Sequence, residues 1–355
     1  MKKYQIAEIG ENDNQAGSKA PSDIADVADS LGYERCVVRI NLNGHSVFSK
    51  IRRQFFYCLD YSKALKQIEP GSVVLLQHPF HHKQINREKI LRTLKTDKQV
   101  KIISVVHDVE ELRGYRFNDY YKNEFSTMVE LADVIIVHNE KMLDWFISAG
   151  IPENRLISLD IFDYLQDNEY RRPEFERSIN VAGNLDVVKC KYIAQLKDID
   201  GVDVHLYGPN FDKSMSESSS VHYHGSFPSS EIPSKLNKGF GLVWDGDSIE
   251  DCIGESGQYL RYNNPHKLSL YLSSGLPVVI WKDAAEAGFV SSNDLGICVG
   301  SLRELGKFLE SVDEGRYGKI ADNVASIRRK LIKGDFTHEA LSKAEGLIGE
   351  RNLDV

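Results

Sequence analysis

Short runs of consecutive apolar residues recur along the chain and alternate with longer stretches in which apolar residues return every three or four positions. The runs have the length of strands, and the longer stretches have the period of helices. Strands are expected at residues 4–9, 36–40, 73–76, 101–106 and 134–137, and again at 178–182, 202–206, 221–224, 239–244, 278–280 and 295–299. Because these runs alternate with helical stretches, they predict parallel strands covered by helices on both faces, which is an α/β fold.

One of the helical stretches, residues 47–65, is rich in aromatic residues. Helical spacing places Phe48, Ile51, Phe55 and Leu59 on one face. We expect this face to belong to the core rather than to form a platform for carbohydrate. A second stretch, from Asp23 to Leu31, is expected to be the helix that follows the first strand.

The regular alternation stops at residues 160–176, where aromatic, charged and proline residues follow no clear period. A chain of 355 residues is long enough for two domains. We therefore interpret this segment as the crossing between a first domain of residues 1–162 and a second of residues 163–336, with a last helical segment at 337–355.

The composition of the chain excludes several classes of protein. At 41% hydrophobic and 27% charged residues, the chain has the composition of an ordinary soluble protein, and its net charge of −8 argues against a nucleic-acid partner. The five cysteines are scattered and lack CxxC spacing, so we expect reduced, mostly buried thiols. No run reaches the ~18 apolar residues that span a bilayer, and the first residues do not have the pattern of a signal peptide.

The segment from Tyr262 to Trp281 predicts a loop, a helix, a turn and a buried strand. Asn263 and Asn264 can cap the helix, and Pro265 suits its first turn. His266 and Lys267 follow in the same turn. A cation normally avoids the positive end of a helix dipole, so this lysine indicates a compensating anion, for which phosphate is the natural candidate. The alternative is a capped helix with a solvated lysine.

The run Pro-His-Lys-Leu-Ser-Leu-Tyr-Leu-Ser-Ser-Gly-Leu-Pro-Val-Val-Ile, residues 265–280, resembles the nucleotide-sugar motif of GT-B glycosyltransferases. Within these enzymes the chain is most similar to the bacterial galactofuranosyltransferase and Gtf-three-type glucosyltransferase family, over nearly its whole length. The resemblance implies two Rossmann-like domains facing a cleft. Residues 1–162 would form the acceptor side, residues 163–336 would bind the nucleotide sugar, and the C-terminal helix would cross back onto the first domain.

This sequence departs from the wider GT-B pattern at one position. Many of these enzymes carry a glutamate three residues after the lysine, where it binds the ribose of the donor, and this chain has Leu270 there. Ribose recognition is therefore expected from Asn263, Asn264 or the backbone.

Further donor contacts are expected at the ends of other strands. In GT-B enzymes the turn after the first strand of the second domain commonly supplies a basic residue to the diphosphate, which here indicates Lys189, with Lys191 in reserve. Gly183 and Asn184 open that turn, and the glycine would let the backbone approach the ligand. Tyr207 follows the next strand, where it would stack on uracil or bond the donor, or else be a buried tyrosine.

The loop after the first strand is long for its place, and long loops at strand ends often carry function. Its Gly17 and Ser18 could present N–H and hydroxyl groups to the donor, and the resemblance implies that this loop reaches the cleft. A surface loop without a ligand is the alternative.

His107 and Asp108 directly follow a buried strand in the first domain. Ligands of doubly wound sheets bind beyond the carboxyl ends of strands, so we expect one of the two to take a proton from the acceptor hydroxyl. The motif His-Asp-Val-Glu-x-Leu-Arg is similar to one in the resembled family. The alternative is a polar pair that caps a helix.

Two other segments contain residues that could bind a metal ion. The histidines of the segment from Gln77 to Lys83 lack a nearby set of carboxylates. Asp245 and Asp247 form the Asp-x-Asp pair of GT-A glycosyltransferases, but the two-domain pattern and the Pro-His-Lys run oppose that interpretation. We expect no metal and no cofactor, since the UDP-sugar is a substrate.

The expected reaction is metal-independent transfer of a glucosyl or galactofuranosyl group from a UDP-sugar to a glycan or a glycoprotein glycan. A UDP-sugar epimerase of the same fold would need paired carboxylates in the cleft, and a non-catalytic subunit of a transferase complex would bind without turnover. A cytoplasmic homo-oligomer is expected, with peripheral contact at the inner face of the membrane left open. The sequence does not distinguish the donor sugar, the acceptor, or retention from inversion.

Overall fold

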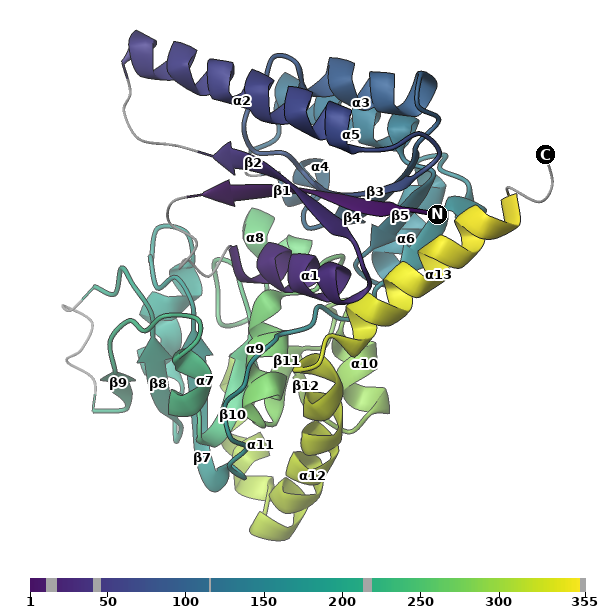
Figure 1. Cartoon of the computed structure of the whole chain (residues 1–355). Coiled ribbons are helices and arrows are strands. Elements are labelled where there is room, and N and C mark those ends of the chain that lie inside the picture. Colours follow the sequence, from purple (N-terminus) through teal and green to yellow (C-terminus); the bar gives the residue numbers. More distant parts are fainter. Residues whose placement is uncertain (11–17, 41–45, 115, 213–218, 352–355) are drawn as a thin grey trace.

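The computed structural model describes residues 1–10, 18–40, 46–114, 116–212 and 219–351, which form two α/β domains, one above the other in Figure 1. The first domain is built on a six-stranded parallel sheet of order β2-β1-β3-β4-β5-β6. Its strands are β1 Lys3–Gly10, β2 Glu34–Ile40, β3 Val73–His78, β4 Lys101–Val106, β5 Val134–Val137 and β6 Leu156–Ser158.

The second domain repeats the plan with a parallel sheet of order β12-β11-β10-β7-β8-β9. Its strands are β7 Glu174–Ala182, β8 Asp203–Tyr207, β9 Val221–Tyr223, β10 Lys238–Val243, β11 Val278–Trp281 and β12 Gly296–Val299. The apolar runs of the sequence became buried strands because helices shield both faces of each sheet from water. The short strand β6 has only three residues and was not predicted.

The helices lie around the two sheets in Figure 1. In the first domain they are α1 Lys19–Ser30, α2 Val47–Gln67, α3 Arg87–Thr96, α4 Glu110–Arg113, α5 Asp119–Leu131 and α6 Glu140–Ser148. Those that follow are α7 Ile232–Lys235, α8 Gly254–Tyr259, α9 His266–Ser274, α10 Ala287–Ser292, α11 Leu305–Ser311, α12 Glu314–Leu331 and α13 Asp335–Arg351, with short 3₁₀ helices at Glu153–Arg155, Lys191–Asp198 and Leu302–Glu304.

The last helix, α13, crosses back to the first domain, as expected (Figure 1). Its apolar residues Leu341, Ala344 and Ile348 are buried in the same cluster as Ile24 of α1. At its start, the backbone N–H of Thr337 donates to the carboxylate of Asp163 at 2.7 Å, which satisfies one of the donors that a helix leaves open at this end.

Helix α1 begins at Lys19, four residues earlier than the sequence predicted. Pro21 is tolerated because the first turn of a helix makes no use of its missing N–H. Lys19 forms an ion pair with Asp23 one turn later, which adds to the early start. The segment between β10 and α9 contains the short helix α8.

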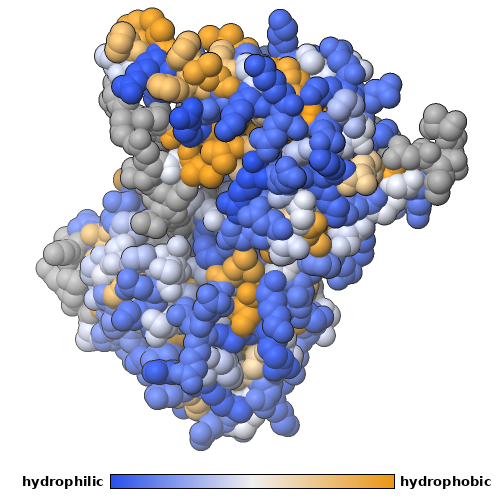
Figure 2. Space-filling model, in the orientation of Figure 1, coloured by the Kyte–Doolittle hydropathy of each residue, from blue (hydrophilic) through white to orange (hydrophobic). Residues whose placement is uncertain are grey.

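The prediction for α2 was wrong about which face is buried. Phe48, Ile51, Phe55 and Leu59 are exposed, and the core receives the opposite face with Tyr57, Tyr61 and Ala64. Figure 2 shows apolar atoms gathered over this part of the surface, at the top of the view. The helical period finds apolar faces but does not say which one meets the sheet when a helix has two.

Candidate functional site

A pocket of about 570 Å³ lies where the carboxyl ends of the first sheet meet the start of α9 from the second domain. This is the edge at which ligands of open α/β sheets bind. The pocket brings together seven of the residues chosen from the sequence, which are Ser18, His107, Asp108, Asn263, Asn264, Pro265 and His266. Lys189, Lys267 and the turn at Gly183 belong to the second domain beyond the lining of this pocket.

Asn264 has a different role from the capping role expected of it. Its amide donates to the carbonyl of His138 at 2.6 Å, its Oδ1 accepts from Asn139 at 2.6 Å, and its backbone N–H donates to Nδ1 of His138 at 2.8 Å. Because His138 and Asn139 follow β5, these bonds join the two domains. The side chain of Asn264 is buried and fully used, so it holds the domains together instead of reaching for ribose.

The start of α9 has no side-chain cap. Pro265 occupies the cap position, and it makes no hydrogen bond with its side chain. The N–H of Leu268 donates to the carbonyl of Pro265 at 2.8 Å, and the N–H groups of His266 and Lys267 have no partner in the described part of the chain, so they are left for another acceptor. Asn263 is beside them, and its Oδ1 is buried without a partner among the described residues. An unpartnered polar atom in the lining of a pocket is where a ligand hydroxyl could bond.

His266 is a neutral side chain in this site. Burial and the nearby Lys19 ammonium together lower its pKa to about 4. Its ring stacks on Tyr164, with centroids 5.2 Å apart, and Nε2 has no hydrogen-bond partner among the described residues. His266 can therefore contribute a hydrogen bond but no positive charge to a diphosphate at this helix start.

Lys267 points its ammonium to the carboxyl end of β10. Nζ donates to the carbonyl of Trp244 at 2.8 Å and lies 3.6 Å from Oδ2 of Asp245. The lysine is thus held by one carbonyl and one carboxylate, and neither excludes an incoming phosphate oxygen as a further acceptor, since an ammonium has three donors.

The two aspartates of the Asp-x-Asp pair each face a lysine. Asp245 faces Lys267, and Asp247 forms an ion pair with Lys191 at 2.8 Å. Among the described residues, no group of three or more histidine, cysteine or acidic side chains could hold a metal ion. The histidines at and after the end of β3 have different partners, since His78 bonds to Ser104 and His81 to Tyr121.

The turn after β7 is exposed and closely packed against the next strand end. Gly183 has a φ of +141°, and its carbonyl lies so close to Gly208 that a side chain there would clash. Asn184 bonds to Asn210 across the turn at 2.9 Å, and Lys189 is exposed at its end. The structure thus places these residues at the carboxyl end of the second sheet, near the end of β8.

Two positions of the second domain face its interior. Tyr207 is buried, and its ring stacks on His224 with centroids 4.7 Å apart, which agrees with the buried-tyrosine alternative rather than with stacking on uracil. Leu270, where other enzymes carry the ribose-binding glutamate, is part of the apolar core.

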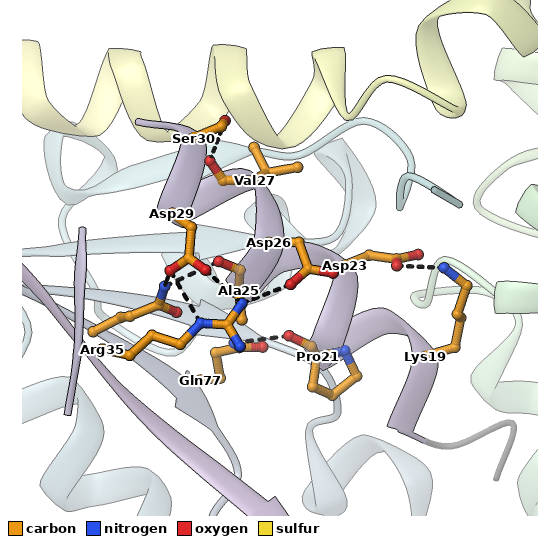
Figure 3. A network of polar contacts seen from close by, with 11 residues as sticks. Lys19, Pro21, Asp23, Ala25, Asp26, Val27, Asp29, Ser30, Arg35 and Gln77 are labelled. Atoms are coloured by element: carbon orange, nitrogen blue, oxygen red, sulfur yellow. Dashed lines mark hydrogen bonds and ion pairs between the residues drawn. The ribbon is translucent and has the colours of Figure 1, made fainter. Parts of the chain in front are cut away.

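His107 is held firmly at the end of β4. Its Nε2 bonds to Oε1 of Gln77 at 2.6 Å, and the amide of Gln77 donates in turn to the carbonyl of Pro21 at 3.1 Å. Figure 3 shows Gln77 beside Pro21 in the first turn of α1, where Lys19 also turns toward Asp23. The amide orientation places the proton on Nε2 of His107. Burial lowers the pKa of His107 to about 3, so this imidazole is a weak base.

Asp108 is the better base of the two. Burial raises its pKa to about 6, against the opposing effect of Arg113, whose Nη1 lies 2.7 Å from Oδ2. A carboxylate with a pKa near neutrality is suited to proton transfer at pH 7. Tyr259 of the second domain reaches the same place, where its hydroxyl accepts from the backbone N–H of Val109 at 3.0 Å.

Sequence reasoning missed Glu8, which lies near the carboxyl end of β1 and lines the same pocket. Its carboxylate accepts a hydrogen bond from Gln84 at 2.7 Å, and burial raises its pKa. The sequence feature that could have indicated Glu8 is an acidic residue inside the otherwise mostly apolar first strand. Of the loop that follows, Ser18 lines the pocket just before α1, and Gly17 lies outside the described residues.

Family comparisons cover both domains. Residues 3–161 match the Glucosyltransferase 3-like N-terminal domain, and residues 179–344 match the Glucosyltransferase 3-like C-terminal domain. The chain is 33% identical to the beta-1,6-galactofuranosyltransferase WbbI of Escherichia coli K12, over 96% of this chain and 97% of that one. It is 25% identical to glucosyltransferase 3 of Streptococcus gordonii, over 92% of each chain.

Solved structures confirm the GT-B architecture. Anabaena Alr3699/HepE, in complex with UDP and glucose, superposes with a TM-score of 0.63 at 12% identity, covering 98% of this chain and 100% of that one. An alpha-glucosyltransferase in complex with UDP and a 13-mer DNA superposes with a TM-score of 0.60 at 15% identity, over the same shares. At this identity the likeness concerns the fold alone.

Proposed function

The chain belongs to the Glucosyltransferase 3-like family of glycosyltransferases, and from this premise we propose that it transfers a glucosyl or galactofuranosyl group from a UDP-sugar to a hydroxyl of a glycan or glycoprotein glycan. The observation that carries the proposal is the pocket in which the uncapped start of α9 faces Asp108 of the first domain. A relative named as a galactofuranosyltransferase and one named as a glucosyltransferase support the two donor sugars.

In this proposal the second domain holds the donor. The diphosphate would lie at the first turn of α9, where unbonded N–H groups and the ammonium of Lys267 favour negative charge. Lys189 would approach from the turn after β7, and Asn263 would bond the ribose. These groups would stabilise the charge that develops on the leaving UDP, which is electrostatic catalysis without a metal ion.

The first domain would hold the acceptor. Asp108 would accept the proton of the acceptor hydroxyl. The oxygen of that hydroxyl would form a bond to the anomeric carbon of the donor sugar, and the bond from this carbon to the diphosphate oxygen would break. His107 would position the acceptor through its ring, since its low pKa makes it a poor base at neutral pH. Product stereochemistry tests this step, because a base that activates the acceptor for direct displacement predicts inversion.

The partners follow from the same proposal. The donor is a UDP-sugar, the acceptor is a glycan or glycoprotein glycan, and the reaction would take place in the cytoplasm at the inner face of a membrane, in a homo-oligomer. Among the described residues, no helix is both long enough and apolar enough to cross a membrane.

A donor panel tests the proposal. The protein would be incubated with UDP-glucose or UDP-galactofuranose, with and without a glycan acceptor, and the products would be read by mass spectrometry. We expect a mass increase of one hexose on the acceptor. A changed donor sugar without acceptor would support an epimerase, and UDP binding without any product would support a non-catalytic subunit.

A further inference from the structure

Helix α2 presents an apolar surface to solvent that the fold does not use. We call it the α2 outer face and define it as five residues with large exposed fractions. They are Val47 at 73%, Phe48 at 76%, Ile51 at 64%, Phe55 at 60% and Leu59 at 47%. They follow helical spacing along three turns, so they form one stripe on the surface of the first domain (Figure 2). A continuous apolar stripe of this kind indicates an interaction surface rather than scattered exposure.

The rest of α2 is accounted for by the core. Tyr57, Tyr61 and Ala64 project from the opposite side and are buried against the sheet. Truncating the α2 outer face would therefore leave the packing of the first domain intact. A further exposed apolar residue, Ile85, is tied to α2. Its backbone N–H donates to the side-chain oxygen of Gln54 at 3.1 Å.

Basic residues border the stripe. Helix α2 carries five basic side chains and one carboxylate, a net charge of +4 on a chain whose net charge is −8. The basic residues are Lys50, Arg52, Arg53, Lys63 and Lys66. The carboxylate, Asp60, is buried on the inner side and pairs with Arg39.

Part of this positive charge has no opposite charge beside it in the described part of the chain. Arg52 and Arg53 form no ion pair with a carboxylate of the described residues, and Arg52 lies over the ring of Phe56 at 5.6 Å. Helix α2 thus differs in the sign of its net charge from the chain as a whole. Such a distribution orients a protein toward an anionic surface.

The α2 outer face also lies next to the substrate pocket. A second pocket of about 460 Å³ beneath the start of α2 is lined by Phe48, Arg52 and Arg53. It shares Ile9 and Ile40 with the pocket that holds Asp108. Molecules that belong to a surface bound at α2 would therefore lie close to the pocket that contains Asp108.

We propose that the α2 outer face docks on the surface of an anionic lipid bilayer, with its apolar stripe among the upper acyl chains and its basic border at the headgroups. An interfacial helix has this pattern of one apolar face flanked by lysine and arginine, and anionic headgroups supply the charge that the arginines lack. A second copy of the chain fits poorly, because two such faces would bring like charges together. The docking rests on the proposed function only in placing the acceptor at that surface.

Vesicle sedimentation with the full chain tests the docking. The probes are vesicles of phosphatidylcholine alone and vesicles with about 30% phosphatidylglycerol. We expect binding to the anionic vesicles that weakens with salt, and at least tenfold weaker binding to the neutral ones. The variant Phe48→Ser/Ile51→Ser/Phe55→Ser should lose at least tenfold in affinity for anionic vesicles, and so should Arg52→Glu/Lys66→Glu.

Matched controls separate location from composition. Ile147→Ser/Phe308→Ser removes exposed apolar side chains from α6 and α11, and Lys307→Glu/Lys319→Glu makes the same change of charge on the second domain. Both control variants should bind vesicles like the parent. Equal losses in control and test variants would overturn the assignment to α2.

Three further measurements distinguish docking on a bilayer from misfolding, from the absence of docking and from self-association. The same preparations would be titrated with UDP by calorimetry, and unchanged UDP affinity in the α2 variants would show that the fold and donor site are intact. A parent protein that binds UDP and transfers sugar but ignores anionic vesicles would refute the docking while leaving the proposed function in place. Self-association in ultracentrifugation that the α2 variants abolish would assign the face to a second copy instead.

Discussion

The amide of Asn139 donates to Oδ1 of Asn264 at 2.6 Å and joins the first domain to the segment that leads into α9 of the second. The same amide donates to the carbonyl of Tyr262 at 3.1 Å and to Glu286 at 3.2 Å. All four groups lie at the junction, directly beside the pocket. These bonds therefore fix the position of the start of α9 relative to Asp108, which follows β4. The geometry of the site depends in this way on the contact between the two domains.

Removing this link is expected to cost stability. Asn264→Ala would leave the buried carbonyl of His138 without its partner, and a buried group left unpaired costs about 1–3 kcal/mol. It would also remove one of the three acceptors of the Asn139 amide. Chemical denaturation of the parent and the variant would measure the loss. Asn263→Ala is the matched neighbour, because the Oδ1 that it removes has no partner among the described residues. Equal stability in the Asn264 variant and the parent would contradict the link.

Lys267 is expected to hold the donor diphosphate. Lys267→Ala should weaken UDP binding by about 1–3 kcal/mol, the range for losing a hydrogen bond to a charged group. Asp245 would then lie near the diphosphate without its lysine at 3.6 Å, which adds repulsion in the same direction. Calorimetric titration with UDP measures the change. The control is Lys282→Ala, which removes a lysine after β11, and unchanged UDP affinity in the Lys267 variant would remove the lysine from the donor site.

Transfer should continue without a divalent cation. Asp245 and Asp247 each face a lysine, so their charge is already balanced. We expect activity to survive EDTA, and we expect Asp247→Asn to retain most of it. The measurement is product formation before and after chelation. Complete loss in EDTA, with recovery on adding manganese, would support the GT-A interpretation of the pair.

The sequence was sufficient for the parts of the site that depend on local order. Lys267 at the start of a helix, and His107 and Asp108 after a strand, are local facts, since an apolar run ends where the polar residues begin. The two sheets followed from the same runs. The resemblance then supplied what no local pattern holds, namely that the two strand-end clusters face each other across a cleft.

What the sequence did not predict depends on contacts between distant segments. Asn264 was expected to cap α9, but it bonds to His138, which lies 126 residues earlier in the chain. The low pKa of His266 and the raised pKa of Asp108 arise mainly from burial, which depends on how the folded chain packs around them. Tyr207 presents the same problem, because the end of a strand can face a cleft or a core, and only packing decides between them.

The pH dependence of transfer should report the base. Burial raises the pKa of Asp108 to about 6, and a base acts only when deprotonated, so turnover should fall about tenfold per pH unit below about pH 6. Arg113 favours the charged carboxylate, so Arg113→Gln should move this acid limb to higher pH. Turnover at saturating donor between pH 5 and 8 measures both effects. An acid limb that stays in place when Arg113 is replaced would argue against Asp108 as its origin.

The division of labour between the domains gives the last prediction. Asp108 belongs to the acceptor side, so Asp108→Asn should lower turnover by about 10²–10⁴ and leave UDP affinity nearly unchanged. His107→Ala should also spare UDP binding, but with a pKa near 3 it is expected to act through position, so His107→Gln should recover part of the rate. Turnover and UDP calorimetry on the three variants measure the two roles separately. If neither Asp108→Asn nor His107→Ala slows transfer, the base lies elsewhere in the pocket, where Glu8 is the next carboxylate. If both lose UDP binding in a folded protein, the donor is not held by the second domain alone.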